Sequence, residues 1–192
     1  GEQATVPQAL ALLNGQLTVK DAIQEIVISQ YFNARNPGND TFVSVVLEQL
    51  LGVVVQDEPK LLEAGKSMYD GHQAQFLGRQ GDSQSDVVYA VLGDPRFLPL
   101  LLRRHYERVL MAAPLPADLQ RWASMLASDG GAYETIVREW IASPAYDQAL
   151  NMRRAKSDHM WIRSLFLDLL DRKPTFDEYR NFRNAVQALS DS

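Results

Sequence analysis

The side chains best suited to acid–base or metal chemistry are three histidines, His72, His105 and His159. None of them stands in a His-x-x-x-His or His-Glu-x-x-His spacing, so the sequence does not predict a zinc helix. We interpret His105 as a surface or half-buried residue, and His159 with Asp158 as a local hydrogen-bonding pair. No Gly-x-Ser-x-Gly elbow marks a serine for acyl transfer. We therefore predict no catalytic residue and expect the chain not to be an enzyme.

The acidic stretch Asp82–Asp86, DSQSD, is a second candidate, because it superficially resembles the start of a calcium loop. It lacks the central glycine, and Gly93 occupies the twelfth position, where a calcium loop has Glu. The neighbouring stretch Leu77–Asp82 contains glycines but not the Gly-x-x-x-x-Gly-Lys pattern of a phosphate loop. We predict no metal and no cofactor for this chain.

The other charged and aromatic residues are expected to be structural. The carboxylate pairs Asp57/Glu58 and Asp177/Glu178 lie at or near predicted helix starts, where the helix dipole favours negative charge. Arg163 and Arg172 are expected to tether neighbouring helices through acids such as Asp168 or Asp171. Six aromatic residues fall at helical spacing on apolar stripes and are expected to form core: Trp122, Trp140, Trp161, Phe166, Tyr179 and Phe182.

Composition narrows the class of protein. With 192 residues, of which 46% are hydrophobic, the chain can bury a real core. Residues 1–97 carry 6 Lys+Arg and 12 Asp+Glu, and residues 98–192 carry 13 and 12, so neither half has the basic excess that nucleic-acid binding needs. The absence of cysteine excludes disulfides and thiolate metal sites. No apolar run approaches the length of a membrane span.

The elements that must position these residues are helices, because the apolar periodicity is helical nearly throughout and no segment alternates convincingly like a strand. We predict an all-α array or bundle of short helices, with segment 72–83 as a long loop or insertion. Helix-start signals are the capping pairs Thr18/Asp21 and Thr175/Glu178, and the cap residues Ser85, Ser143 and Ser157.

A phrase of apolar residues recurs along the chain, as LEQLLG (Leu47–Gly52), YERVLM (Tyr106–Met111) and FLDLLD (Phe166–Asp171). Its last leucines, Leu51, Leu110 and Leu170, are separated by 59 and 60 residues. Downstream of the second and third copies, the matched pairs are Pro114 with Pro174, Leu119 with Tyr179 and Trp122 with Phe182. A repeated unit of a few short helices must stack on its neighbours to bury its apolar stripes.

A second phrase closes the repeated units, as QEIVISQYF (Gln24–Phe32), VYAVLGDPRF (Val88–Phe97) and VREWIASPAY (Val137–Tyr146). We therefore predict a single all-α domain, 1–192, made of about three degenerate helix–turn–helix repeats. It contains a partial repeat 7–32, a repeat 42–97 with the insertion 72–83, a repeat 98–146 and a half repeat 157–190.

These phrases resemble an uncharacterised family of helical repeats in bacterial secreted and cell-surface proteins, whose phrases run like FVRxLYxDLLGRxPD…W and FLxSPEY. Here they appear as WIRSLFLDLLDRKPTFDEYRNF and WIASPAYDQAL. Similar phrases occur in surface-layer anchoring domains and, more distantly, in phycobilisome linkers. Asp171 stands where the family favours glycine, and the first repeat lacks Arg-x-Pro. The stretch Thr5–Gly15 is similar to a phrase in large exported planctomycete proteins. These resemblances imply a periplasmic, extracellular or cell-envelope setting and no reaction.

The leading functional hypothesis is a non-catalytic protein-interaction or scaffolding module of a bacterial exported or cell-envelope protein. Repeats that are incomplete at both ends of the chain are expected to leave apolar faces open to a protein partner or to a second copy. The alternative is an accessory small-ligand- or glycan-binding domain of a larger secreted enzyme, which would need a pocket with convergent polar groups.

Overall fold

The computed structural model describes residue 11 and residues 16–128, 132–152 and 158–190. Over these residues the chain is all-α, as the periodicity predicts, apart from one two-stranded sheet. It forms two compact units, and the divisions between them fall within the helix α7 (Phe97–Leu110), between residues 114 and 115, and within the helix α9 (Ala132–Ile141). Unit 1 contains residues 1–103 and 115–136, and unit 2 contains residues 104–114 and 137–192.

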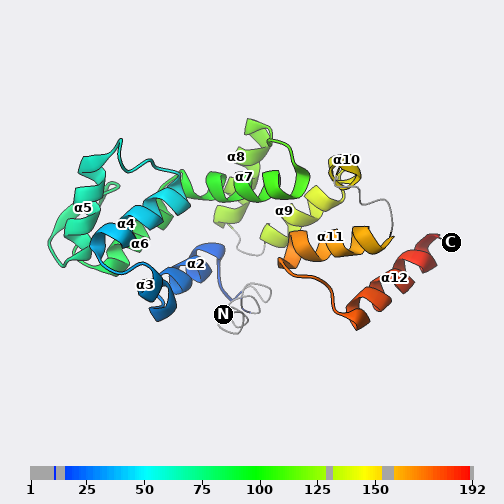
Figure 1. Cartoon of the computed structure of the whole chain (residues 1–192). Coiled ribbons are helices and arrows are strands. Elements are labelled where there is room, and N and C mark those ends of the chain that lie inside the picture. The colour runs from blue at the N-terminus through cyan, green and yellow to red at the C-terminus, as the bar shows by residue number, and fades with distance from the viewer. Residues whose placement is uncertain (1–10, 12–15, 129–131, 153–157, 191–192) are drawn as a thin grey trace. The chain divides into compact units, whose positions relative to one another are not determined.

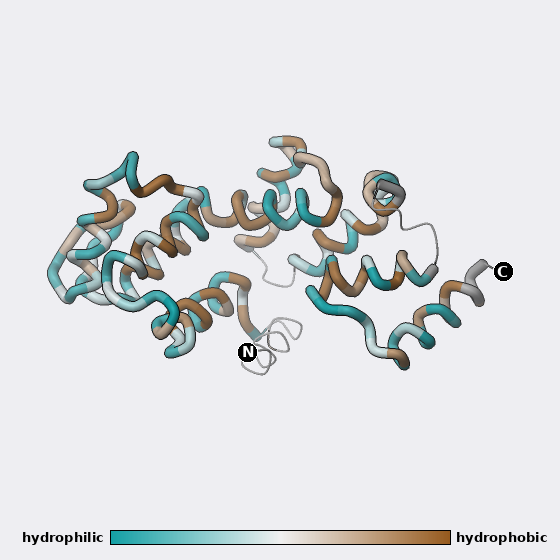
Figure 2. The backbone as a smooth tube through the Cα atoms, in the orientation of Figure 1, coloured by the Kyte–Doolittle hydropathy of each residue, from teal (hydrophilic) through white to brown (hydrophobic). Residues whose placement is uncertain are grey.

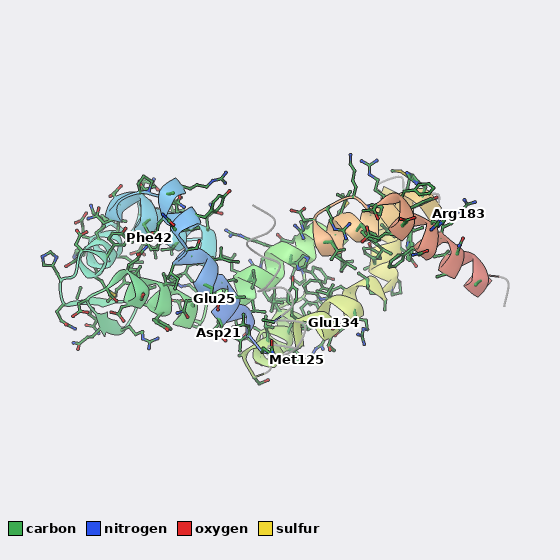
Figure 3. The ribbon with its side chains drawn as sticks, turned by 90° about the horizontal axis from the view of Figure 1, so that it is seen from below. Asp21, Glu25, Phe42, Met125, Glu134 and Arg183 are labelled. Carbon is green, nitrogen blue, oxygen red and sulfur yellow. The ribbon has the colours of Figure 1, made fainter. Side chains whose placement is uncertain are left out.

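Unit 1 is a bundle of short helices around an apolar core (Figure 1). Before α7 its helices are α2 (Val19–Val27), α3 (Gln30–Arg35), α4 (Asn39–Val46), the π-helical turn η2 (Leu47–Leu51), α5 (Pro59–Tyr69) and α6 (Gln84–Gly93), and after α7 comes α8 (Pro116–Ser128). Helix α5 packs against both α4 and α6. Phe42 of α4, labelled in Figure 3, is fully buried and meets the ring of Phe32 edge-on at 5.7 Å.

The segment 72–83, predicted as a long loop or insertion, contains a β-hairpin, so the expectation that it is a loop is wrong. Strands β1 (Ala74–Phe76) and β2 (Arg79–Gly81) pair antiparallel, with Ala74 opposite Gly81. Strands of three residues are too short to show an alternating pattern in the sequence. The side chain of Phe76 is fully buried against Gly65 of α5, where an added Cβ would lie 2.9 Å from Phe76 Cε2. The hairpin therefore belongs to the core of unit 1.

Most of the expected helix starts are confirmed. Thr18 and Asp21 form a reciprocal capping box at α2, with Thr18 N donating to Asp21 Oδ2 at 3.0 Å. Ser143 precedes α10 (Pro144–Met152), with Pro144 as its first residue. Helix α6 is capped by Ser83 and not by Ser85, so that helix begins earlier than predicted. Ser157 and nearly all of the stretch Thr5–Gly15 lie outside the described residues.

Unit 2 packs the C-terminal half of α7 with the end of α9, α10, α11 (Asp158–Leu170) and α12 (Phe176–Ser190). Its buried side chains include Val109, Leu110, Trp140, Tyr146, Ile162 and Phe166. Helix α12 packs on α11, and none of the α12 side chains that the structure describes is buried. In Figure 2, hydrophobic and hydrophilic residues alternate along α12, as in an amphipathic helix.

The three copies of the apolar phrase end in the same backbone geometry. The residue after each final leucine is left-handed: Gly52 (φ 67°), Met111 (φ 53°) and Asp171 (φ 52°). Each donates its backbone N–H to a carbonyl four residues earlier, at 3.1, 2.9 and 3.1 Å respectively. This is the ending that favours glycine after a helix.

The closing phrases also share a turn. Ser29 Oγ donates to the Ile26 carbonyl at 2.6 Å, and Ser143 Oγ donates to the Trp140 carbonyl at 2.7 Å. Three residues after each serine comes the aromatic of the phrase, which is half-buried at Phe32 and buried at Tyr146. The two segments, 114 residues apart, therefore fold alike.

Candidate functional site

A buried polar cluster in unit 2 centres on Asp168 of α11, whose side chain lies in the interior. Tyr146 Oη of α10 donates to Asp168 Oδ2 at 3.2 Å. The backbone carbonyl of Asp168 accepts from Arg108 Nη2 of α7 at 3.2 Å and lies 3.4 Å from His105 Nε2. Three helices are therefore tied together by one carboxylate and its own carbonyl group.

His105 is half-buried in this cluster, as the sequence predicts. Its ring meets Trp140 of α9 edge-on at 5.4 Å, and burial lowers the pKa of the imidazole below 6.5. Nearby Arg108 lowers this pKa further, while Asp168 opposes the shift. The imidazole is packed against aromatic and backbone groups. This arrangement is suited to fixing helices, and we assign it a structural role.

Of the two arginines expected to tether helices, Arg172 pairs with an acid other than those predicted. Arg172 holds Glu178 with two hydrogen bonds, of 2.8 and 2.7 Å, and it is Arg108 that lies 3.8 Å from Asp171. Sequence reasoning did not single out Arg108 or Tyr146 as polar partners. In the sequence, Arg108 lies near the end of a predicted helix and Tyr146 follows the Ser-Pro turn. Their common partner, Asp168, lies 60 residues after Arg108 and 22 residues after Tyr146.

The other residues that the sequence offered as candidates for a site stabilise local structure. In the stretch Asp82–Asp86, Asp86 Oδ2 accepts from Ser83 Oγ at 2.6 Å and from Asp82 N at 3.1 Å. These hydrogen bonds lower the pKa of Asp86. In return the Asp86 N–H donates to Ser83 Oγ at 3.2 Å, and this bond caps α6. Within the described ranges, no group of three or more His, Asp or Glu residues is placed to hold a metal ion. His159 packs edge-on against Tyr179 at 4.9 Å, and His72 is exposed.

Unit 1 contains a shallow pocket of about 240 Å³ between α2, the α6–α7 turn and α8. Its polar lining residues include Lys20, Asp94, Gln120 and Ser124, and Leu98 and Pro99 are among the apolar ones. Asp94 is held by Arg96 through hydrogen bonds to both carboxylate oxygens, each 2.8 Å, and this pairing lowers the pKa of Asp94. The pocket is thus lined by both polar and apolar groups.

The hairpin formed by α11, the turn 171–175 and α12, called the open hairpin below, exposes apolar residues that were expected to be core. Leu169, Leu170 and Phe182 are 41, 54 and 45% exposed. Their counterparts 60 residues earlier, Val109, Leu110 and Trp122, are 0, 2 and 3% exposed. Of the six aromatic residues predicted as core, Trp122, Trp140 and Phe166 are buried, Trp161 and Tyr179 are half-buried, and Phe182 is exposed.

The open hairpin is held in shape by its own contacts. Glu178 accepts from both Arg172 and the Thr175 backbone N–H, the latter at 2.8 Å, and Glu178 N donates to Thr175 Oγ1 at 3.3 Å. The Arg172 guanidinium lowers the pKa of Glu178 to about 2 and also stacks on the Phe166 ring at 5.3 Å. Phe166 in turn meets Phe182 edge-on, again at 5.3 Å. The exposed side chains therefore sit on a preorganised support.

Phe176, at the start of α12, is 76% exposed and is a further exposed apolar residue of the open hairpin. Arg180 lies over its ring at 6.0 Å and pairs with Asp177 at 3.1 Å. Arg183, labelled in Figure 3, lies on the same helix and is also exposed. Aromatic and arginine side chains together on a surface are typical of protein contact sites.

No helix in the described part of the chain is long and apolar enough to cross a membrane. Comparisons with protein-family models, with curated proteins and with solved structures found no match.

Proposed function

We propose that this chain is a non-catalytic protein-interaction or scaffolding module whose contact surface is the open hairpin. The observation that carries the proposal is the exposure of Leu169, Leu170 and Phe182 at positions whose repeat counterparts are buried. Exposing such side chains to water costs stability, at about 25 cal/mol for each Å² of apolar surface. A contiguous apolar surface with a polar rim is typical of a binding face.

The support of this surface favours recognition over chance exposure. The clamp between Arg172 and Glu178 fixes the turn, and Phe166 fixes Phe182. A surface that is ordered before binding loses less conformational entropy when a partner docks. The chemistry of the cluster around Asp168 supports the non-catalytic part of the proposal, because its groups are engaged in joining helices.

The setting we propose is a bacterial exported or cell-envelope protein, and it rests on the resemblance of the WIRSLFLDLLDRKPTFDEYRNF and WIASPAYDQAL phrases to the secreted helical repeats. The left-handed residue at Asp171 supports the match at that position, because the family favours glycine there. Cell fractionation of a strain that expresses the full-length parent protein tests the setting.

Site-specific photocrosslinking tests the interaction surface. A photoreactive phenylalanine at position 182 is expected to give a discrete protein adduct in the producing cell. The same residue at position 89 in unit 1 is the matched control, because Tyr89 is 44% exposed and lies outside the hairpin. Adducts from position 182 but not from position 89 support the proposal. Failure of position 182 to form a protein adduct would overturn it.

The pocket in unit 1 favours a second candidate function, the binding of a small ligand or a glycan unit. Lys20 and Gln120 can donate hydrogen bonds to hydroxyl or carboxylate oxygens, and Leu98 and Pro99 offer an apolar wall. Ser124 Oγ donates to the Gln120 carbonyl at 2.9 Å and can accept a hydrogen bond from a ligand hydroxyl. Its volume of about 240 Å³ suits a group no larger than one sugar ring. A glycan array screen of the protein and of its Lys20→Ala variant tests this candidate, with loss of a specific signal in the variant as the expected result.

A further inference from the structure

We infer that the pocket in unit 1 binds a small molecule that carries both a carboxylate and hydroxyl groups, such as a uronic acid unit of a glycan. This inference rests on the second candidate function above and names the class of its ligand. The site is the pocket of about 240 Å³ between α2, the α6–α7 turn and α8. All of its lining residues belong to unit 1.

Small side chains of α8 leave space for a ligand in this pocket. Ala123 and Ala127 lie one helical turn apart, and both line the pocket together with Ser124. The first turn of α7 adds Leu98 and Pro99 as apolar surface. Apolar surface beside a few polar groups suits a sugar ring, which has both C–H groups and hydroxyls.

Lys20 of α2 supplies a positive charge to the pocket. It is half-buried, and no acid in the described part of the chain lies within ion-pair distance of its ammonium group. The next residue of the helix, Asp21, is held by Thr18, whose N–H and Oγ1 donate to Asp21 Oδ2 at 3.0 and 2.6 Å. A charge-assisted hydrogen bond to a carboxylate is stronger than one to a neutral oxygen. The pocket therefore favours a ligand that brings a carboxylate to Lys20.

Asp94, the other charged lining residue, is already neutralised. Its side chain is 9% exposed, and Arg96 donates to Oδ1 from N at 2.9 Å and from Nε at 2.8 Å, and to Oδ2 from Nη2 at 2.8 Å. Because Oδ2 accepts only one of these hydrogen bonds, it can accept another from a ligand hydroxyl. An ammonium group there would be repelled by the Arg96 guanidinium. A hydroxyl is therefore preferred to an amine beside Asp94.

Two uncharged side chains of α8 complete the polar lining. The Gln120 amide can both donate and accept a hydrogen bond. Ser124 Oγ donates to the Gln120 carbonyl at 2.9 Å, so toward a ligand hydroxyl it acts as an acceptor. One free cation beside several groups that bind hydroxyls matches a uronate, which has one carboxylate and several hydroxyls.

We expect weak binding, with a dissociation constant on the order of 1 mM, because the pocket is shallow and water screens its charge. The chain as a whole has a net charge of −5, which opposes the approach of an anion. At physiological ionic strength, however, charges more than about 8 Å apart are largely screened. Lys20, which lines the pocket, therefore outweighs the more distant acids.

Two-dimensional NMR of the isotope-labelled chain tests the inference with glucuronate, glucose and glucosamine as probes. With up to about 20 mM of each sugar, we expect glucuronate to shift the backbone amide signals of Lys20, Gln120 and Ser124 until they saturate. The same signals should stay in place with glucose and with glucosamine. All titrations are run at one physiological ionic strength, so that a shift reports the sugar and not the added salt.

Substitutions test the role of the charge. Lys20→Gln should weaken glucuronate binding at least about fivefold, because it removes the charge-assisted hydrogen bond, and Lys20→Arg should retain most of the affinity. The matched control is Lys60→Gln, which removes an exposed lysine of α5 outside the pocket and should bind like the wild type. Ala127→Phe fills the pocket from α8 and should abolish binding; it is the second variant in case Lys20→Gln changes the fold.

Each result decides the inference. A glucuronate titration that shifts no pocket amide overturns it, as does binding that survives both Lys20→Gln and Ala127→Phe in folded protein, judged by circular dichroism. Equal shifts with glucose and glucuronate also overturn it, because the carboxylate then has no role, while the small-ligand candidate stands. If none of the three sugars shifts a pocket amide, the inference fails and the glycan array alone decides the candidate function.

Discussion

The α7–α8 hairpin and the open hairpin are built on the same plan but bury their apolar residues differently. Both have a five-residue connection that opens on a left-handed residue, Met111 or Asp171, and the second helix begins at equivalent positions, Pro116 and Phe176. Yet Trp122 is buried and Phe182 is not. An apolar stripe in the sequence thus indicates that a helix face can be buried. Whether that face is buried depends on the elements that pack around it.

The largest expected effect comes from truncating the matched aromatic residues. Trp122→Ala should lower the free energy of unfolding by about 3–5 kcal/mol, because it leaves a cavity in a packed interior. Phe182→Ala should cost about 1 kcal/mol or less at monomer concentrations, since the ring is 45% exposed and its truncation leaves no closed cavity. Urea denaturation followed by circular dichroism measures both values.

Equal losses of unfolding free energy in Trp122→Ala and Phe182→Ala would contradict this comparison. Equal losses would mean that Phe182 is as well covered in solution as Trp122. Repeating the measurement at low and high protein concentration separates a cover within the chain from one supplied by a second copy, because only the latter makes stability depend on concentration.

Substitutions at the left-handed residues that end the three repeated helices are expected to change stability by an intermediate amount. Met111→Gly should stabilise the fold by about 1 kcal/mol, because it relieves a left-handed backbone that costs a residue with a Cβ about 1–2 kcal/mol. Asp171→Gly should gain only a few tenths of a kcal/mol, since Asp tolerates this conformation better. Gly52→Ala should lose about 1 kcal/mol at the first copy of the turn. Thermal unfolding of the three variants ranks them, and a stabilising Gly52→Ala would show that the three turns are not equivalent.

The smallest expected effect concerns the clamp that only the open hairpin has. Thr175 and Glu178 form a capping box joined to Arg172, whereas the matched positions in the first hairpin are Leu115 and Asp118. The folded-state pKa of Glu178, about 2, lies below its usual 4.5, so its contribution to stability is present above pH 4.5 and is lost as pH falls toward 2.

Melting temperatures between pH 2 and pH 6 test this dependence. Glu178→Gln should remove part of the acid-induced decrease seen in the wild type, and Asp177→Asn, which alters a neighbouring exposed carboxylate, should leave it nearly unchanged. An acid profile identical in wild type and Glu178→Gln would show that the clamp contributes nothing measurable in solution.

Sequence periodicity was enough to predict the all-α fold and most helix starts, because capping and apolar spacing are local properties. The capping boxes at Thr18 and Thr175 are examples. The pairing of Arg172 with Glu178 is local, six residues apart, and depends on the conformation of the turn between α11 and α12. The burial of Asp168 could not be predicted, because its contacts with Arg108 and Tyr146 join helices far apart in the sequence. The exposure of Phe182 was not predicted for the same reason. The sequence of an amphipathic helix is the same whether its apolar face is fully or only partly buried.

The β-hairpin Ala74–Gly81 has a consequence for how this chain can change over time. Phe76 of the hairpin and Val43 of α4 together fill the space beside Gly65, where an added Cβ would lie 2.9 Å from Phe76 Cε2 and 2.6 Å from Val43 Cγ1. A larger residue at 65 is therefore expected to require smaller residues at both 43 and 76. Removing the hairpin to obtain a minimal domain would open a hole in unit 1, so the hairpin is a required part of the fold.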